Sequence, residues 1–143
     1  MTRMECFKET VRRLEPITGE AKAEARYMLA YLFQCEFSDL YLHGTQQMTE
    51  KETRAWENFV EQRKTGMPLA YVLQERWFMG MPFWVTPDVL IPRQDTELLV
   101  ETGLELIEKN NLQAVLELCT GSGCVAISLA KYAGKHIDAL DIS

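Results

Sequence analysis

Apolar residues in the first half of the chain recur every three or four positions, which is the spacing of one face of an α-helix. The spacing predicts helices over residues 2–14 and 20–34, separated by Pro16 and Gly19. A shorter helix is predicted over residues 37–42.

A helix start signal follows at Thr49, where the sequence reads Thr-Glu-Lys-Glu. This order predicts a capping box, in which the Thr49 hydroxyl and the Glu52 carboxylate each bond a backbone N–H that the helix leaves unpaired. The helix is expected to continue to Thr65 and to end at Gly66. Residues 1–75 are therefore predicted to form a small helical bundle.

The periodicity changes after this bundle. Two aromatic-rich runs on either side of Gly80 predict a β-hairpin over residues 76–85. A further short extended run is predicted at residues 89–91, because Pro92 disfavours helix in the residue before it. We expect residues 76–94 to form a β-hairpin linker.

The last part of the chain follows an order of helix, strand, turn, helix and strand. The predicted elements are a helix over 96–109 capped by Asp95, a buried strand over 114–118, a Gly-rich turn over 119–123, a helix over 125–132 and a strand over 136–140. Residues 95–143 are predicted to be the first β-α-β of a truncated Rossmann-like sheet, so the fold class is α plus α/β. Two parallel strands cannot bury both faces. We therefore expect the sheet to be incomplete at Ser143, and residues 112–143 either to stay partly open or to pair with a second copy.

Composition and charge exclude several classes of protein. The net charge is −6, which argues against sequence-independent binding to nucleic acid. The four cysteines form no C-x-x-C pair, so we expect free buried thiols and no zinc site. No signal peptide and no run of 18 apolar residues occurs, which predicts a cytoplasmic protein without a membrane span.

The loop between the two predicted parallel strands suits a ligand. Gly121 and Gly123 let a ligand approach the backbone, and the N–H groups that begin the next helix bind electronegative groups. Asp141 follows the second strand, where its carboxylate can accept hydrogen bonds from both hydroxyls of a ribose. Together these features indicate an adenosine-containing ligand.

Two cofactor classes compete for this site. Gly121-x-Gly123-x-x-Ala126, with Asp141 twenty residues after Gly121, also satisfies the dinucleotide fingerprint, so a fragment of an NAD-dependent oxidoreductase is one alternative. Glu117, near the end of the first strand, would repel a pyrophosphate but suits the ammonium and sulfonium of S-adenosylmethionine, which the charge therefore favours. A carboxylate that only braces the loop N–H groups is compatible with either cofactor. A third, non-enzymatic alternative is that the helical bundle is a protein-binding module.

Several segments together resemble one family. Residues 89–101, Val-Leu-Ile-Pro-Arg-Gln-Asp-Thr-Glu-Leu-Leu-Val-Glu, resemble the signature ahead of the methyltransferase core in the peptide chain release factor glutamine-N5 methyltransferases. Residues 66–72, with Phe78 and Phe83, are similar to the linker and hairpin of that family. Residues 117–123 resemble its first cofactor motif. The resemblance is loose in the helical part and close from about residue 63 onward.

The resemblance implies transfer of a methyl group from S-adenosylmethionine to a glutamine side-chain amide of a peptide chain release factor. It also implies that the helical first part helps to hold this protein substrate. The positions that match the cofactor site are Cys119, Thr120, Gly121, Ser122 and Gly123, with Asp141 as the ribose-binding acid. Arg93 and Glu97 match the signature and are expected near the cofactor pocket.

The sequence departs from the family pattern in two respects. Cys119 stands where the first glycine of the turn is usual. The family's Asn-Pro-Pro-Tyr motif, which orients the glutamine amide, does not occur in these 143 residues. We therefore predict no catalytic residue in this chain and expect it to be inactive by itself.

Overall fold

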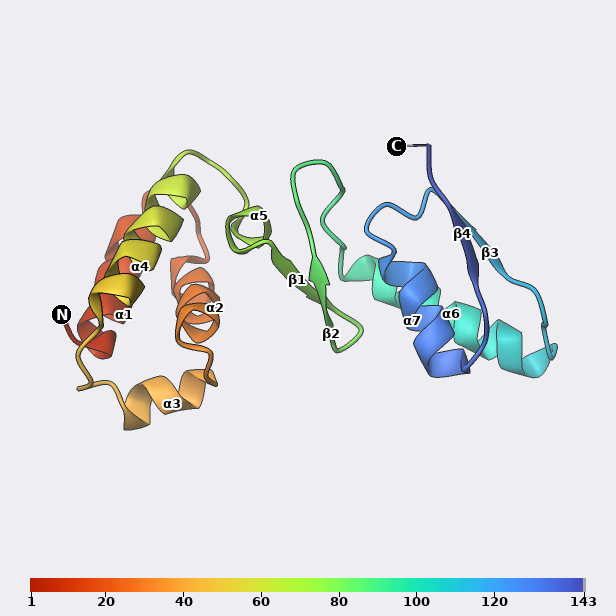
Figure 1. Cartoon of the computed structure of the whole chain (residues 1–143), viewed down its shortest axis with the longest axis horizontal. Coiled ribbons are helices and arrows are strands. Elements are labelled where there is room, and N and C mark those ends of the chain that lie inside the picture. The colour runs from red at the N-terminus through yellow and green to blue at the C-terminus, as the bar shows by residue number, and fades with distance from the viewer. Residues whose placement is uncertain (143) are drawn as a thin grey trace. The chain divides into compact units, whose positions relative to one another are not determined.

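The computed structural model describes residues 1–142 and contains two compact units (Figure 1). The first unit comprises Met1–Leu73 and the second begins at Gln74. Each has its own cluster of buried apolar side chains, as is typical of a domain. Within the described residues, no helix is both long and apolar enough to cross a membrane.

The first unit is helical throughout. Its elements are α1 (Arg3–Leu14), α2 (Ala21–Phe33), α3 (Phe37–Leu42), α4 (Glu50–Lys64) and α5 (Leu69–Leu73). Helices α1, α2 and α4 lie side by side, and α3 crosses one end of them (Figure 1). The helical first part that the sequence predicts is therefore present.

Capping boxes close the N-termini of α1 and α4. Thr49 Oγ1 accepts from the Glu52 N–H at 3.2 Å, and the Glu52 carboxylate accepts from the Thr49 N–H at 2.7 Å. This confirms the predicted box. Thr2 and Glu5 make the same reciprocal bonds at the start of α1, so Thr2 is the cap of this helix and not, as the periodicity predicts, part of it.

Helix α5 does not follow from the sequence pattern. Its five residues are too few to show a helical period. The helix follows Pro68, whose carbonyl accepts from the N–H groups of Tyr71 and Val72 at 3.0 and 3.1 Å. Val72 and Leu73 are buried in the core of the first unit. Burial in the tertiary structure, and not local periodicity, therefore determines this helix.

A buried polar contact joins α1 to α4. Trp56 Nε1 donates to Thr10 Oγ1 at 2.8 Å, and the Thr10 hydroxyl donates to the Cys6 carbonyl at 2.7 Å. Trp56 is 3% exposed and Thr10 is 0% exposed, so these bonds satisfy groups that water cannot reach. Burial raises the pKa of the free Cys6 thiol to about 12, which keeps it neutral and unreactive.

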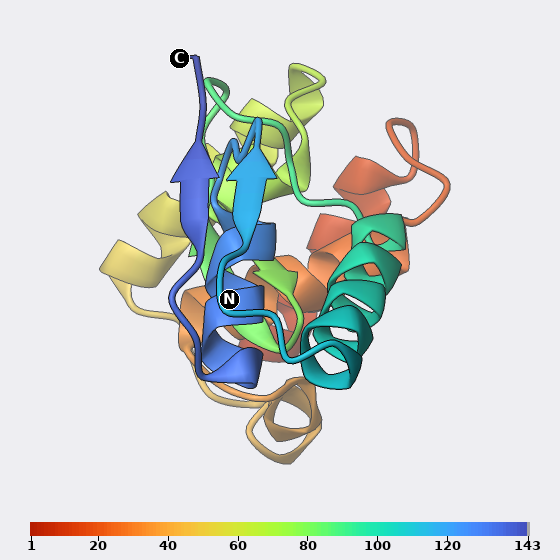
Figure 2. The same ribbon diagram turned by 90° about the vertical axis from the view of Figure 1, so that its right-hand side faces the viewer.

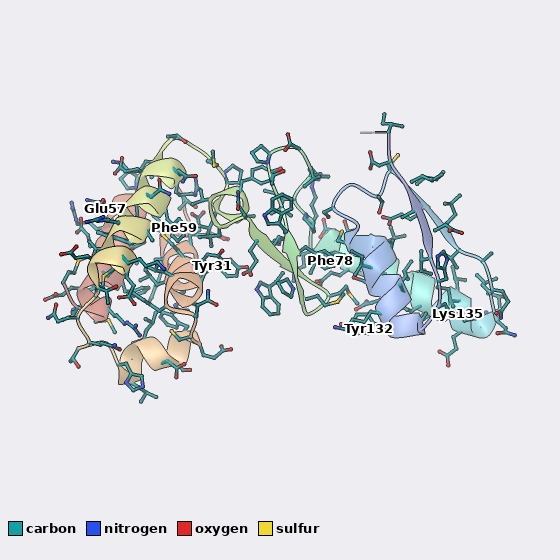
Figure 3. The ribbon with its side chains drawn as sticks, viewed as in Figure 1. Tyr31, Glu57, Phe59, Phe78, Tyr132 and Lys135 are labelled. Carbon is teal, nitrogen blue, oxygen red and sulfur yellow. The ribbon has the colours of Figure 1, made fainter. Side chains whose placement is uncertain are left out.

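Aromatic and ionic contacts connect α2 to α4. The rings of Tyr31 and Phe59 meet edge to face with centroids 6.1 Å apart (Figure 3). The Arg63 guanidinium makes two hydrogen bonds to the Glu24 carboxylate, at 2.7 and 3.0 Å, and both side chains are mostly shielded from water. A bidentate pair of this kind fixes the relative position of the two helices.

The second unit combines a β-hairpin, two long helices and a pair of parallel strands within residues 74–142. Its elements are β1 (Glu75–Phe78), β2 (Met81–Trp84), α6 (Asp95–Lys109), β3 (Leu116–Leu118), α7 (Cys124–Ala133) and β4 (Asp138–Leu140). The predicted hairpin is observed, with β1 and β2 antiparallel and Arg76 opposite Phe83. The predicted order of strand, turn, helix and strand is also observed.

The structure differs from two local predictions in this unit. Residues 89–91 form no strand, and Val89 ends a turn in which its N–H bonds the Thr86 carbonyl at 3.1 Å. Asp95 is not a helix cap either. Gln94 occupies that position without a side-chain cap, and Asp95 is the first helical residue. At this position its negative charge still interacts favourably with the positive end of the helix dipole.

The core of the second unit lies between the hairpin and the two helices. Phe78 and Phe83 point from the hairpin into it, with ring centroids 6.1 Å apart. Helices α6 and α7 pack closely at Gly103, where a Cβ would lie only 3.0 Å from Leu129 Cδ2. The absence of a side chain at Gly103 therefore permits this approach.

Strands β3 and β4 lie side by side and run in the same direction (Figure 2). Leu118 is opposite Leu140, on the same face of the pair as Leu116. These side chains are 66%, 57% and 54% exposed, so the prediction of a buried strand is wrong here. Burial of a parallel strand needs cover on both faces, and in this unit one face carries exposed leucines.

Candidate functional site

The turn between β3 and α7 has a left-handed backbone at three alternate residues. The φ angles are 61° at Cys119, 54° at Gly121 and 75° at Gly123. Glycine adopts such angles without a steric penalty, whereas a residue with a Cβ does so at a cost. Cys119 thus adopts the left-handed backbone that a glycine would favour at this position. Its free thiol is exposed, which contradicts the prediction that all four thiols are buried.

The Asp141 carboxylate joins the end of β4 to this turn. Its Oδ2 accepts from the Gly121 N–H at 2.7 Å, and its Oδ1 accepts from the Ile142 N–H at 2.8 Å. The Thr120 N–H also bonds across to β4, donating to the Leu140 carbonyl at 3.1 Å. Hydrogen bonds therefore join the turn after β3 to the residues at the end of β4. This is the carboxyl edge of the two parallel strands, where open α/β sheets bind ligands.

The Glu117 carboxylate accepts hydrogen bonds from the turn and from the start of α7. Its Oε2 accepts from the Thr120 hydroxyl at 2.6 Å and from the Ala126 N–H at 2.9 Å. Ala126 lies in the first turn of α7, where backbone N–H groups lack helical partners. The carboxylate therefore satisfies one of these groups and places a negative charge at the positive end of the helix.

The middle of the turn has no close neighbour on the side where a Cβ would lie. A Cβ built on Gly121 meets no atom within 4 Å, whereas one built on Gly123 would lie 3.2 Å from Ile127 Cδ1. The backbone at Gly121 is thus open to an approaching group. Ser122 is half-buried, and burial raises the pKa of the Cys124 thiol, two residues further along the chain. The open backbone at Gly121 and the carboxylates of Glu117 and Asp141 fit a ligand that contacts backbone and acidic oxygens.

Glu97 contacts the hairpin. Its carboxylate accepts from the Met79 N–H at 2.7 Å, and the Tyr132 hydroxyl donates to the Met79 carbonyl at 2.5 Å. Tyr132 lies on α7 (Figure 3). Met79 and Gly80 both have positive φ, as in the type I′ turn of a two-residue hairpin. Neither Met79 nor Tyr132 is predicted from the sequence as a site residue, and the Met-Gly pair between two aromatic runs is the local signal of this turn.

Arg93 lies two residues before the first residue of α6, and it is exposed. Its backbone carbonyl accepts from the Thr96 N–H at 3.0 Å. Among residues 1–142, no hydrogen bond links Arg93 or Glu97 to the turn between β3 and α7, whereas Glu117, Thr120, Gly121 and Asp141 are joined there. A cofactor role for Arg93 and Glu97 stays a prediction.

Comparisons with known proteins match both units. Residues 5–73 match the family model described as the PrmC N-terminal domain. The chain is 38% identical over 122 residues to the release factor glutamine methyltransferase of Clostridium acetobutylicum, an alignment that covers 84% of this chain and 42% of the relative. It is 41% identical over 112 residues to that of Bordetella pertussis, covering 78% and 42%. It is 33% identical over 145 residues to that of Koribacter versatilis, covering 100% and 52%.

Over most of its length the chain is similar to the family of release factor glutamine methyltransferases. The match to the N-terminal domain of this family ends at Leu73, which is also the last residue of α5 and of the first unit. The alignment that covers the whole chain includes the turn between β3 and α7. The chain spans about half the length of the curated relatives that it matches.

Proposed function

We propose that this chain is the first part of an enzyme that transfers a methyl group from S-adenosylmethionine to a glutamine side-chain amide of a peptide chain release factor. The observation that carries the proposal is the identity of 38% with a relative named release factor glutamine methyltransferase, over most of the chain. Release factors act with the ribosome, so the proposed location is the cytoplasm.

The proposed cofactor site consists of Glu117, residues 119–123 and Asp141, in the opening β-α-β of a Rossmann-like sheet. The left-handed turn supports this role because a ligand can approach its backbone at Gly121, where a Cβ would meet no atom within 4 Å. The Asp141 carboxylate accepts from the Gly121 and Ile142 N–H groups, and an ionised carboxylate can accept several hydrogen bonds, so a ribose hydroxyl can be a further donor to it. The bonds to Gly121 and Ile142 hold the carboxylate in place for that contact.

The position of Glu117 favours S-adenosylmethionine over NAD. In a dinucleotide site the pyrophosphate lies at the N-terminus of the helix after the Gly-rich turn. Here the Glu117 carboxylate bonds the Ala126 N–H in the first turn of that helix. A pyrophosphate would compete with this carboxylate and be repelled by its charge, whereas the cationic sulfonium and ammonium of S-adenosylmethionine would be attracted.

Methyl transfer to an amide requires a bound cofactor, an oriented amide and a held protein substrate, and different parts of the enzyme would provide these. When bound, S-adenosylmethionine supplies an activated methyl group on a sulfonium. A glutamine amide nitrogen is a poor nucleophile, because its lone pair is delocalised into the carbonyl, so the amide must be aimed at the methyl carbon. The residues of this chain would bind and orient the cofactor through the turn and Asp141. The first unit would contribute to holding the release factor.

The test uses the full-length protein, because the family resemblance places the amide-orienting motif outside these residues. Calorimetry with S-adenosylmethionine and, separately, with NAD should show binding of the first only. Mass spectrometry of a release factor after incubation should show one added methyl group on a glutamine. A release factor with that glutamine replaced by asparagine is the matched control and should stay unmodified. Binding of NAD in place of S-adenosylmethionine would contradict the proposal.

A further inference from the structure

The hairpin of the second unit has one buried and one exposed aromatic face. Side chains alternate between the two faces of a strand. Phe78 and Phe83 lie on the buried face and are 1% and 7% exposed. Trp77 and Trp84 lie on the opposite face and are 51% and 72% exposed. Exposed apolar patches are typical of interaction sites, and tryptophan is enriched among the residues that dominate binding energy. Two large indoles exposed on one small surface therefore indicate a binding site.

The strand register places four side chains on this surface, which we name the tryptophan face. Trp84 is opposite Glu75, and Trp77 is opposite Pro82. The two indoles are therefore diagonal neighbours, at a typical spacing of about 7 to 8 Å for such pairs. Trp77 Nε1 donates to Glu75 Oε1 at 3.1 Å, which brings a carboxylate to the edge of one ring. The surface thus combines two π-faces, a flat proline and a negative charge.

The charge of the second unit indicates what such a surface would attract. From residue 74 onward the sequence holds ten Asp and Glu against five Lys and Arg. The chain as a whole has a net charge of −6, so most of this net charge lies in the second unit. An arginine side chain stacks on indole, gains from the cation–π interaction and can bond a carboxylate.

We propose that the tryptophan face binds an arginine-containing, extended segment of a protein partner. An arginine guanidinium would stack on Trp84 or Trp77 and meet the Glu75 carboxylate at the rim. The partner's backbone would lie over Pro82, between the rings. This proposal rests on the proposed function in so far as the partner is the protein substrate.

A membrane surface fits these observations less well than a protein. Peripheral membrane surfaces combine exposed tryptophans with lysines and arginines that attract anionic lipids. The tryptophan face carries Glu75 and belongs to an acidic unit, so an anionic bilayer would repel it.

The binding test uses the 143-residue chain without cofactor, so its failure would leave the proposed function intact. The chain contains three tryptophans, and Trp56 is buried in the first unit, which makes its indole an internal reference. The probe is a short glycine–serine peptide carrying several arginines, titrated while the indole N–H signals are followed by NMR. The signals of Trp77 and Trp84 should shift with the peptide, and the signal of Trp56 should not. A peptide with glutamine in place of every arginine should produce no shift.

Variants distinguish specific binding at the tryptophan face from non-specific binding of the peptide to the chain. Trp84→Ala and Trp77→Ala should each weaken peptide binding about tenfold, and Glu75→Gln about threefold, as expected for cation–π and exposed ionic contacts. Leu98→Ala is the matched control, because Leu98 is a 66% exposed apolar residue of the same unit, and it should bind as the parent does. Trp84→Phe keeps an aromatic ring and should retain most of the binding, which tests the proposal if the alanine variants fail to fold.

Four results would overturn the proposal. They are the absence of any shift with the arginine peptide, an equal shift with the glutamine peptide, a shift that requires anionic vesicles, and self-association of the chain that Trp84→Ala abolishes. The first two would show that the tryptophan face does not recognise arginine. The last two would assign the tryptophan face to a membrane or to a second copy.

Discussion

The carboxylate of Asp141 lies 2.7 Å from the backbone nitrogen of Gly121, twenty residues earlier in the chain. This hydrogen bond brings the acid after β4 to the glycine at the centre of the turn after β3. The contact connects the two features that indicate an adenosine ligand from sequence. An acid that is already anchored loses less freedom when a ribose binds than a mobile side chain does.

Replacement of Asp141 by alanine should weaken binding of S-adenosylmethionine to the full-length protein by about 1 to 3 kcal/mol, because hydrogen bonds to a charged acceptor are lost. Calorimetry measures the difference. Asp138→Ala is the matched control, since Asp138 is an exposed acid in β4, the strand that Asp141 follows, and its carboxylate lies 3.6 Å from His136 Nδ1. Equal affinities for the parent and Asp141→Ala would show that Asp141 does not contribute to cofactor binding.

Cys119→Gly should raise the free energy of unfolding of the chain by about 0.5 to 1 kcal/mol, because glycine accepts a φ of 61° without a Cβ clash. Urea unfolding followed by circular dichroism gives the value. Cys119→Ala keeps the Cβ and should leave stability nearly unchanged, whereas the branched Cys119→Val should lower it by about 1 to 3 kcal/mol. A glycine variant less stable than the alanine variant would show that the turn does not strain Cys119.

The cysteines should differ sharply in reactivity toward a thiol reagent at pH 8. Cys119 is exposed and should react within the mixing time, whereas Cys6 should react only as the chain unfolds. The folded pKa of Cys6, about 12, is above its ordinary value of 9.0. The unfolded chain therefore loses this proton first, and stability should fall as the pH rises from about 9 toward 12. A Cys6→Ala variant should lack that part of the alkaline loss.

Thr10→Val should lower the free energy of unfolding by about 1 to 3 kcal/mol, because it removes the acceptor of the buried Trp56 N–H while preserving the shape of the side chain. Thr10→Ser keeps the hydroxyl and is the control. In a Trp56→Phe background, which lacks the N–H, the cost of Thr10→Val should shrink. Equal costs in both backgrounds would mean that the hydrogen bond contributes nothing.

The 143-residue chain should self-associate through the second unit. Leu116, Leu118 and Leu140 are exposed on one face of the pair β3–β4, and the outer edges of such a pair can accept another strand. Sedimentation velocity should show larger species for the whole chain than for residues 1–73, and Leu118→Lys should return the chain to a monomer. A monomeric parent chain at high concentration would contradict this prediction.

Local chemistry was sufficient for much of this structure to be predicted. The Thr49 capping box depends on four consecutive residues, and the helices up to Lys64 depend on spacings of three and four, so neither needs information from distant parts of the chain. The turn between β3 and α7 was recognisable for the same reason, because glycines in an apolar strand-to-helix context indicate a left-handed backbone.

Tertiary structure decided what depends on residues far apart in the sequence. Helix α5 forms because Val72 and Leu73 are buried against other helices, and the signature residue Glu97 bonds the hairpin at Met79, eighteen positions earlier. Asp141 could be recognised from sequence as an acid after a strand, but its bond to Gly121 exists only because β3 and β4 are neighbours. Hydrophobic periodicity reports which side of an element is apolar, and burial is decided by which other elements come to cover that side.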